Sequence, residues 1–333
     1  MEMFDLALIW AFIIGFGIIM YVLMDGFDLG VGILFPFAPN EEARDTMMNS
    51  VAPVWDGNET WLVLGGGGLY AAFPKAYSLL MTAFYIPVFV MLLALVFRGV
   101  AFEFRFKSKN HQKHWDIAFS TGSIIASAMQ GAMLGGFIEG IAVENGRFVG
   151  GAFDWLSPFS IFCATAVVVG YALLGTGWLI MKMEGDFQGN LRRLAKPAVI
   201  WMAANLAVVS LMTTYVNPAY AERWFAMPNL AFLAPIPLIT AGLLVWLWRA
   251  VSHREKTVFG ITLGIFFLCY LGFGITLYPN IVPPMITFRD AAAPQNSLAF
   301  MLVGAVILLP VIFAYTAYAY WVFRGKVSDE GYH

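Results

Sequence analysis

The sequence predicts an all-α integral membrane protein, and its composition and charge carry that prediction. Of the 333 residues, 60% are hydrophobic and 12% are charged, whereas soluble domains carry about 25% charged residues. The formal net charge of −2 favours neither a nucleic-acid-binding protein nor a basic peripheral one. Because the first basic residue is Arg44, the first apolar stretch lacks the positive leader of a cleaved signal peptide. We therefore expect that stretch to be retained as a membrane span.

Nine apolar segments are long enough to be spans, since a bilayer core about 30 Å thick needs about 20 helical residues. The nine segments are approximately residues 6–35, 51–73, 76–98, 118–141, 157–181, 197–216, 228–249, 257–278 and 298–323. The segments between them are short. We therefore expect one polytopic membrane domain over residues 1–333, with no soluble domain.

Basic residues predict the direction of the spans, because cytoplasmic loops carry an excess of Lys and Arg. With nine spans and an outside N-terminus, all but four of the 19 Lys and Arg residues fall on the cytoplasmic side, Arg98 and Arg105 among them. The four that fall outside are Lys75, Arg147, Arg223 and Arg289. This bias predicts an outside N-terminus and a cytoplasmic C-terminus.

Histidine and cysteine positions limit the cofactors that this chain can hold. The two cysteines, Cys163 and Cys269, stand alone in apolar segments, so we expect buried small side chains and no metal site. A haem within the bilayer normally needs histidine, methionine or cysteine axial ligands. The four histidines all fall in expected cytoplasmic loops or at the C-terminus: His111, His114, His253 and His333. We expect no haem held through histidine, so a redox role requires a partner subunit that supplies the ligands.

Two acidic pairs interrupt the first two spans. Asp25 and Asp28 lie in "MDGFDLG", and Asp56 and Glu59 lie in "WDGNETWL". The three-residue spacing puts both carboxylates of a pair on one face of a helix. With the first span running inward and the second outward, both pairs are expected at similar depth, about 10 Å below the cytoplasmic surface. Carboxylates within a membrane are costly and mark function; here they are suited to taking protons from the cytoplasm or to binding a cation.

A second interpretation of these carboxylates stays open. The stretch "DGNET" has the turn character of Asp-Gly and Asn. If the second span begins later than residue 51, Asp56 and Glu59 lie at the membrane surface, where they would cap a helix.

Five stretches, in order along the chain, resemble subunit II of the cytochrome bd-type quinol oxidases. They are "MDGFDLGVG", "NSVAPVWDGNETWL", "FPKAYSLLMTAFYIPV", "FRGVAFEFR" and "WD" at 115–116. The resemblance covers most of the chain and is strongest in its first third. The short chain is most similar to the compact, cyanide-insensitive branch of the family.

The resemblance implies a heterodimer of subunits I and II in the bacterial inner membrane, which oxidises quinol, reduces oxygen to water and generates proton motive force. Subunit I carries two b-type haems, a haem d or a further haem b, and the quinol site. Subunit II is a scaffold of two four-helix bundles and a peripheral helix, here about residues 6–141, 157–278 and 298–323, and it takes part in proton delivery from the cytoplasm. The sequence leaves open which quinone is used, whether a structural quinone binds here, and whether small single-helix accessory subunits join the complex.

The same resemblance assigns roles to particular residues. Asp56 of "WDGNETWL" matches the motif aspartate of the proton path, with Asp25 and Asp28 beside it. Some relatives have an uncharged residue at position 59, which favours an auxiliary role for Glu59. Trp61 matches an aromatic residue near the place where oxygen is thought to enter between the subunits.

Two rival functions remain. A cation-coupled secondary transporter would use the acidic pairs as an ion site and would suit the glycine-rich first two spans. The later spans, however, contain no matching acidic pair. A non-catalytic assembly subunit would only bury surface, which does not explain why four carboxylates cluster at one depth.

Overall fold

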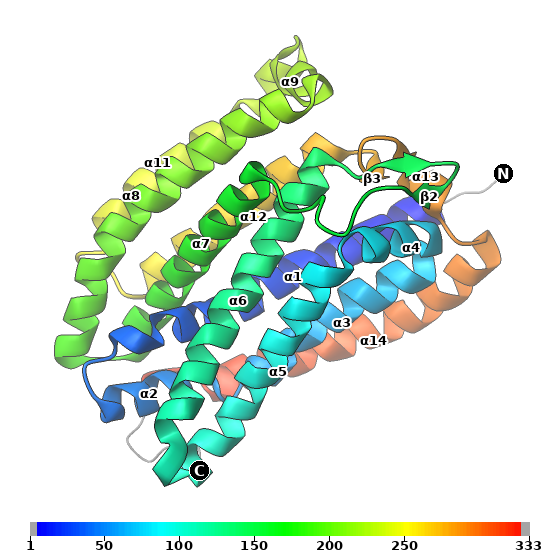
Figure 1. Cartoon of the computed structure of the whole chain (residues 1–333). Helices are drawn as coiled ribbons and strands as arrows, with labels where there is room; N and C mark the ends of the chain where they lie inside the picture. Colours follow the sequence, from blue (N-terminus) through cyan, green and yellow to red (C-terminus); the bar gives the residue numbers. More distant parts are fainter. Residues whose placement is uncertain (1–4, 328–333) are drawn as a thin grey trace.

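Long helices dominate the structure, a computed structural model that describes residues 5–327 (Figure 1). The predicted cytoplasmic end at His333 lies outside the described residues. The long helices are α1 (Leu6–Leu34), α3 (Trp55–Ala72), α5 (Tyr85–Lys107), α6 (Gln112–Glu139), α7 (Pro158–Lys182), α8 (Gly185–Val216), α11 (Pro235–Ala250), α12 (Lys256–Leu277) and α14 (Gln295–Val322). The short helices are η1 (Phe35–Phe37), α2 (Glu41–Val51), α4 (Pro74–Ala83), η2 (Lys109–His111), α9 (Pro218–Phe225), α10 (Asn229–Leu233) and α13 (Phe288–Ala291). Two antiparallel hairpins complete the chain: β1 (Val143–Glu144) with β2 (Arg147–Phe148), and β3 (Asn280–Val282) with β4 (Ile286–Thr287).

Eight segments within residues 5–327 are long and apolar enough to cross a membrane. They are Leu6–Phe37, Tyr85–Lys107, Gln112–Glu139, Pro158–Lys182, Gly185–Val216, Asn229–Ala250, Lys256–Leu277 and Gln295–Val322. The prediction of an all-α, multi-pass membrane protein is therefore confirmed. The predicted span at 51–73 corresponds to α3, which is outside this set because its polar residues and glycine run lower its hydropathy.

The segment between the first two predicted spans differs from the expectation of a plain loop. It forms α2, whose first turn is capped by Asn40, the side chain of which accepts a hydrogen bond from the Ala43 amide at 2.9 Å. Pro53 has no amide hydrogen with which to continue the helical hydrogen bonds, and α2 ends two residues before it, at Val51. The next helix begins only at Trp55, four residues later than predicted, so Asp56 lies in its first turn rather than deep within a span.

The third predicted span also changes. The helix breaks at Phe84, between α4 and α5, and Pro87 lies in the first turn of α5, where a missing amide hydrogen costs little. From there α5 continues to Lys107, well past the predicted end at residue 98. Arg98 and Arg105, which were expected in a cytoplasmic loop, are therefore inside a helix with fully buried side chains.

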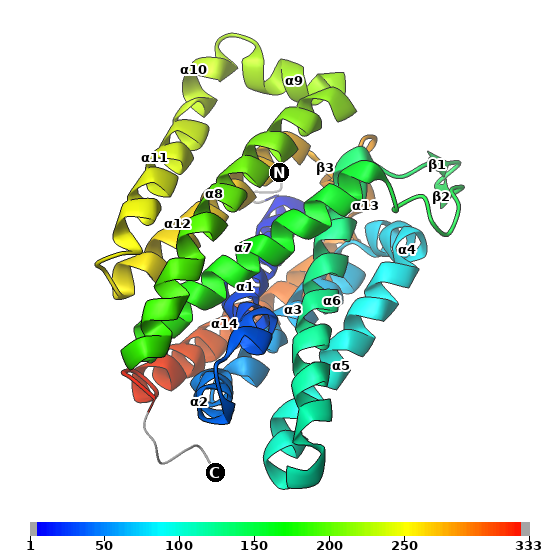
Figure 2. The same ribbon diagram turned by 60° about the vertical axis from the view of Figure 1, so that its left-hand side comes forward.

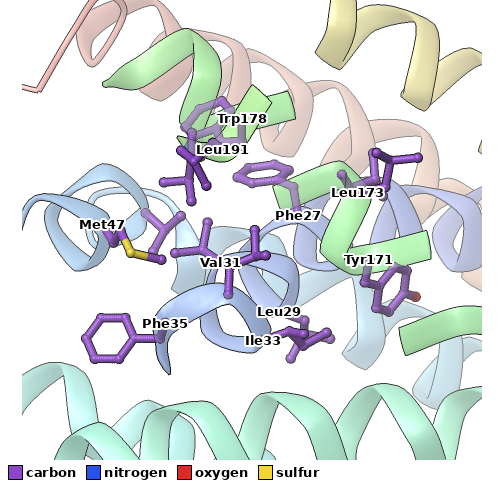
Figure 3. Close-up of a cluster of buried hydrophobic side chains, with 14 of the residues drawn as sticks. Phe27, Leu29, Val31, Ile33, Phe35, Met47, Tyr171, Leu173, Trp178 and Leu191 are labelled. Carbon is purple, nitrogen blue, oxygen red and sulfur yellow. The ribbon is translucent and has the colours of Figure 1, made fainter. Parts of the chain in front are cut away.

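Helix α1 lies at the centre and packs against α3, α6 and α7 (Figures 1 and 2). At its contact with α7 the backbones meet closely: a Cβ atom on Gly30 would lie 1.9 Å from the carbonyl oxygen of Tyr171. Around the second half of α1 the apolar core is continuous (Figure 3), and Phe27 stacks on Trp178 with ring centroids 4.4 Å apart. This packing fixes the part of α1 that carries Asp25.

Candidate functional site around Arg98

Arg98 of α5 is surrounded by three carboxylates from α1 and α3. Its Nη1 atom donates hydrogen bonds to Asp25 Oδ1 and Glu59 Oε1, both at 2.8 Å. Its Nη2 atom lies 3.9 Å from Asp28 Oδ2. The side chains of Arg98, Asp25 and Asp28 are completely buried, whereas that of Glu59 is 25% exposed. These four residues are called the Arg98 cluster below.

The sequence builds this cluster by helical spacing. Asp25 and Asp28 are one turn apart and so share a face of α1, and that face meets both α3 and α5. The prediction that acidic residues of two neighbouring helices lie at the same level is confirmed for Asp25, Asp28 and Glu59, because all three are within 4 Å of one guanidinium. Arg98 itself was missed, because it was counted with the basic residues of a cytoplasmic loop.

Asp56 does not join the Arg98 cluster. It is exposed in the first turn of α3, one turn before Glu59. The side chain of Asp56 makes no capping hydrogen bond, so the cap expected in the second interpretation is not formed. A negative charge in this turn is favoured by the helix dipole. Its place on a proton path stays a prediction.

Trp61, two residues after Glu59, is buried at the contact between α3, α1 and α14. Its indole ring packs edge-on against Phe16 at 6.0 Å and lies 5.3 Å from the ring of Phe313. Both phenylalanines are partly exposed on the outside of the chain. Within residues 5–327 the Trp61 Nε1–H has no hydrogen-bond partner.

The charges of the Arg98 cluster do not balance. One guanidinium faces three acidic groups, so the cluster is neutral only when two carboxyl groups carry protons. Burying an unpaired charge costs several kcal/mol, which favours proton occupancy over a net negative site. Among the described residues, Asp25 Oδ2 and Asp28 Oδ1 have no hydrogen-bond partner, so each can receive a proton. The arrangement is chemically suited to exchanging protons.

Uncharged polar residues extend this cluster on two sides. Asn58 of α3 donates from Nδ2 to Asp28 Oδ2 at 2.7 Å, and Tyr320 of α14 donates to Asn58 Oδ1 at 2.9 Å. One turn before Asp25 on the same face of α1, Tyr21 belongs to a buried chain of hydrogen bonds with two residues of α6 and α7. Gln130 Nε2 donates to the Tyr21 hydroxyl at 2.9 Å, and the Tyr171 hydroxyl donates to Gln130 Oε1 at 2.7 Å.

A second arginine of α5 holds another set of carboxylates near the end of the helix. Arg105 donates from Nε to Asp116 Oδ1 at 2.5 Å and from Nη2 to Glu41 Oε2 at 3.1 Å, and its Nη1 atom also binds Asp45. The side chains of Glu41 and Asp45 are 51% and 43% exposed. Arg105 with these three acids is called the Arg105 cluster; it joins α2, α5 and α6.

The metal- and haem-ligating residue types do not converge in this chain. Within residues 5–327 no group of three or more His, Cys, Asp and Glu side chains has the arrangement of a metal site. His111 and His114 are neighbours, with ring centroids 5.6 Å apart, and His114 lies in the first turn of α6 rather than in the expected loop. Cys163 is buried and Cys269 half-buried, and both are free thiols.

Comparison with known proteins accounts for this geometry. The family model for cytochrome bd terminal oxidase subunit II matches residues 6–323. Cytochrome bd-I ubiquinol oxidase subunit 2 of Escherichia coli (strain K12) is 29% identical, over 98% of this chain and 96% of its own length. Cytochrome bd ubiquinol oxidase subunit 2 of Bacillus subtilis (strain 168) is 27% identical, over 97% of each.

The fold agrees with these relatives. A chain of the bd oxidase from Geobacillus thermodenitrificans superposes with a TM-score of 0.77 at 18% identity, covering 95% of this chain and 98% of its own. The family match spans nearly all the helices described above. The chain therefore belongs to the cytochrome bd oxidase subunit II family, as an inner-membrane subunit of a terminal oxidase.

Proposed function

We propose that this chain pairs with a haem-carrying subunit I to form a quinol oxidase that reduces oxygen to water and generates proton motive force. Subunit I supplies two b-type haems and a haem d or third haem b, together with the quinol site. The names of the relatives, which are ubiquinol oxidase subunits, support this assignment.

The contribution of this chain is proton delivery from the cytoplasm, and the observation that carries this proposal is the charge imbalance of the Arg98 cluster. Reduction of oxygen consumes protons, which must cross low-dielectric protein to reach the oxygen site. Exposed Asp56 collects a proton and partly exposed Glu59 receives it one turn further along α3. Asp25 accepts it next, because Asp25 and Glu59 share the Nη1 atom of Arg98.

The topology that suits this direction has nine spans, an outside N-terminus and a cytoplasmic C-terminus. Helix α3 is the ninth span, because it pairs with α1 along its length. The first bundle is α1, α3, α5 and α6, and the second is α7, α8, α11 and α12, whose contacts form a closed ring. Helix α14 is peripheral. Arg98 pairs with buried carboxylates, so it no longer counts as a basic residue of a cytoplasmic loop. The distribution of the other Lys and Arg residues still supports a cytoplasmic C-terminus.

Oxygen enters near Trp61 in this proposal. The ring of Trp61 lies beneath Phe16 and Phe313, which are 40% and 37% exposed. An apolar, aromatic contact of this kind suits passage of a small apolar gas and disfavours water. The path would begin at the surface shared by α1 and α14.

A cation-coupled transporter is not favoured. Its ion would need to occupy the space between the acidic side chains of α1 and α3. That position is taken by the guanidinium of Arg98, which lies within 2.8 Å of both Asp25 and Glu59.

The test is to neutralise Asp56 and Glu59 separately in the oxidase co-expressed with subunit I. Asp56→Asn and Glu59→Gln should retain haem content but slow quinol-driven oxygen uptake, because an amide keeps the shape and loses the exchangeable proton. Each tenfold loss corresponds to about 1.4 kcal/mol on the limiting step. Asp56→Glu should recover part of the rate. Glu42→Gln, an exposed change on α2, is the matched control, and wild-type turnover in both test variants would refute the proton path.

A further inference from the structure

A hydrogen-bond chain connects the peripheral helix α14 to the Arg98 cluster. The Tyr320 hydroxyl donates to Asn58 Oδ1 at 2.9 Å. The Asn58 amide group then donates from Nδ2 to Asp28 Oδ2 at 2.7 Å and to the carbonyl oxygen of Met24 at 3.3 Å. Asn58 is 1% exposed, so water does not replace any of these partners.

Tyr320 determines which way the Asn58 amide faces. Asp28 Oδ2 and the Met24 carbonyl oxygen are both acceptors, so the end of the amide that faces them is the NH₂ end. The oxygen end then points away from α1 and accepts the hydrogen bond from the Tyr320 hydroxyl. Without that hydroxyl, the oxygen end is a buried acceptor with no partner, and the loss of such a partner costs more than an ordinary surface hydrogen bond.

Tyr320 is itself held in place. Its ring packs edge-on against Trp178 at 6.2 Å and Phe27 at 6.5 Å. Three residues further on, the carbonyl oxygen of Phe323 accepts a hydrogen bond from Lys182 Nζ at 2.6 Å. The end of α14 is therefore fixed against α7, and the hydroxyl of Tyr320 has a defined position relative to α3.

The three carboxylates of the Arg98 cluster are consequently not equivalent. Asp25 and Glu59 share one guanidinium nitrogen at 2.8 Å, whereas Asp28 lies 3.9 Å from the other and accepts instead from Asn58 at 2.7 Å. The ionisable groups that face Asp28 are Asp25 on α1, Glu59 on α3, Arg98 on α5 and Tyr320 on α14. The Asn58 donor occupies Asp28 Oδ2 and leaves Oδ1 as the oxygen of Asp28 that can hold a proton.

We propose that Tyr320 is a positioning residue of the Arg98 cluster: through Asn58 it holds Asp28 Oδ2 as a hydrogen-bond acceptor and so fixes the orientation of the Asp28 carboxyl group, whose Oδ1 is the oxygen that can carry a proton. This inference rests on the proposed proton path. It makes α14 a determinant of proton exchange, although α14 contributes no charged side chain to the Arg98 cluster.

Tyr320→Phe tests the inference in the co-expressed oxidase, because it removes one hydroxyl and keeps the ring. Haem content should be unchanged, while quinol-driven oxygen uptake falls roughly two- to tenfold, the lower part of the range of coupling expected between hydrogen-bonded neighbours. The dependence of the rate on pH should be displaced. In the Asp28→Asn background, Tyr320→Phe should add no further loss, because its effect passes through Asp28. Tyr315→Phe, on the exposed face of the same helix, is the matched control.

The outcomes separate this inference from the proposed function. If Glu59→Gln is slow and Tyr320→Phe keeps the wild-type pH profile, the positioning role is wrong and the proton path stands. Full additivity of Tyr320→Phe and Asp28→Asn also overturns the positioning role. Loss of haem in Tyr320→Phe, with haem retained in Tyr315→Phe, assigns Tyr320 to folding instead. Wild-type turnover in Asp56→Asn and Glu59→Gln alike overturns the proton path itself.

Discussion

Arg98 and Arg105 lie two turns apart on α5, about 10 Å along the helix, and each is surrounded by three carboxylates. Their surroundings differ. In the Arg98 cluster two of the three acids are completely buried, whereas in the Arg105 cluster two are about half exposed. Water therefore compensates the excess negative charge around Arg105, and only protons can do so around Arg98.

One arginine with three carboxylates therefore serves different roles in the two clusters, and the burial of the carboxylates determines which. The Arg105 cluster is a cross-link: Glu41 and Asp45 come from α2 and Asp116 from α6, and Arg44 of α2 adds a second positive charge 4.0 Å from Asp116. It holds one end of the bundle together. Among the described residues, the acids of the Arg98 cluster have no second cation within 4 Å. The excess negative charge there must be neutralised by protons on the carboxyl groups.

Removing the buried arginine is the change with the largest expected effect. Arg98→Met should destabilise the complex by about 3–5 kcal/mol, because it leaves buried acids without their only charged partner. The measurement is the yield and thermal unfolding of the haem-containing complex in detergent. Arg98→Lys should recover less than half, since an ammonium cannot replace a guanidinium shared between two carboxylates. A normal yield for Arg98→Met would mean that these acids are already neutral without it.

Turnover separates the two clusters next. Asp25→Asn should slow quinol-driven oxygen uptake about tenfold, or about 1.4 kcal/mol on the limiting step, with haem content retained. Asp45→Asn, the matched change in the Arg105 cluster, should leave turnover within twofold of the wild type, because solvent can replace its charge. Equal losses in both variants would show that burial does not distinguish the clusters.

Stability and salt sharpen the comparison further. Arg105→Met should cost about 1–2 kcal/mol, less than Arg98→Met, because the partners of Arg105 remain hydrated when it is removed. Raising the salt concentration from 0.05 to about 0.5 M should reduce this cost, since exposed charges are screened over a shorter distance. The cost of Arg98→Met should not change with salt. The readout is the thermal unfolding midpoint of each variant at both salt concentrations.

Much of the fold could be predicted because membrane thickness sets helix length. The segment expected at 157–181 is α7 at Pro158–Lys182, and the one at 257–278 is α12 at Lys256–Leu277. The ends that failed were those set by tertiary contacts. The end predicted at residue 98 was wrong, because the acids that neutralise Arg98 come from α1 and α3, far away in sequence.

Only the acidic residues of the site were predictable. Acidic residues inside apolar runs stand out, so Asp25, Asp28 and Glu59 were found. Arg98 was misplaced, because a basic residue near the end of an apolar run is equally typical of a cytoplasmic loop. Asn58 and Tyr320 carry no signal at all, since uncharged polar residues near helix ends are common and their contact joins residues 262 positions apart.

The smallest expected effect belongs to a third arginine, which is more exposed than Arg105. Arg289 donates to Asp5 Oδ2 from Nε at 2.9 Å and from Nη2 at 2.7 Å. These hydrogen bonds, together with one from the Leu8 amide, hold the pKa of Asp5 below its ordinary value. A lowered pKa in the folded state adds stability above the pKa of the unfolded chain, and that stability is lost as the pH falls through the folded value.

Asp5→Asn isolates this ionic contribution, because asparagine caps a helix as well as aspartate does. At pH 7 the variant should unfold at a slightly lower temperature than the wild type, by less than the shift caused by Arg105→Met, because both side chains of the pair are solvated. The difference should vanish as the pH is lowered below the pKa of Asp5, where the wild-type carboxyl is protonated too. Thermal unfolding followed across this acid range is the measurement. A difference that persists unchanged at low pH would mean that Asp5 acts by packing rather than by charge. The effect of each arginine's ion pairs on stability would then not follow solvent exposure for Arg289, the most exposed of the three arginines.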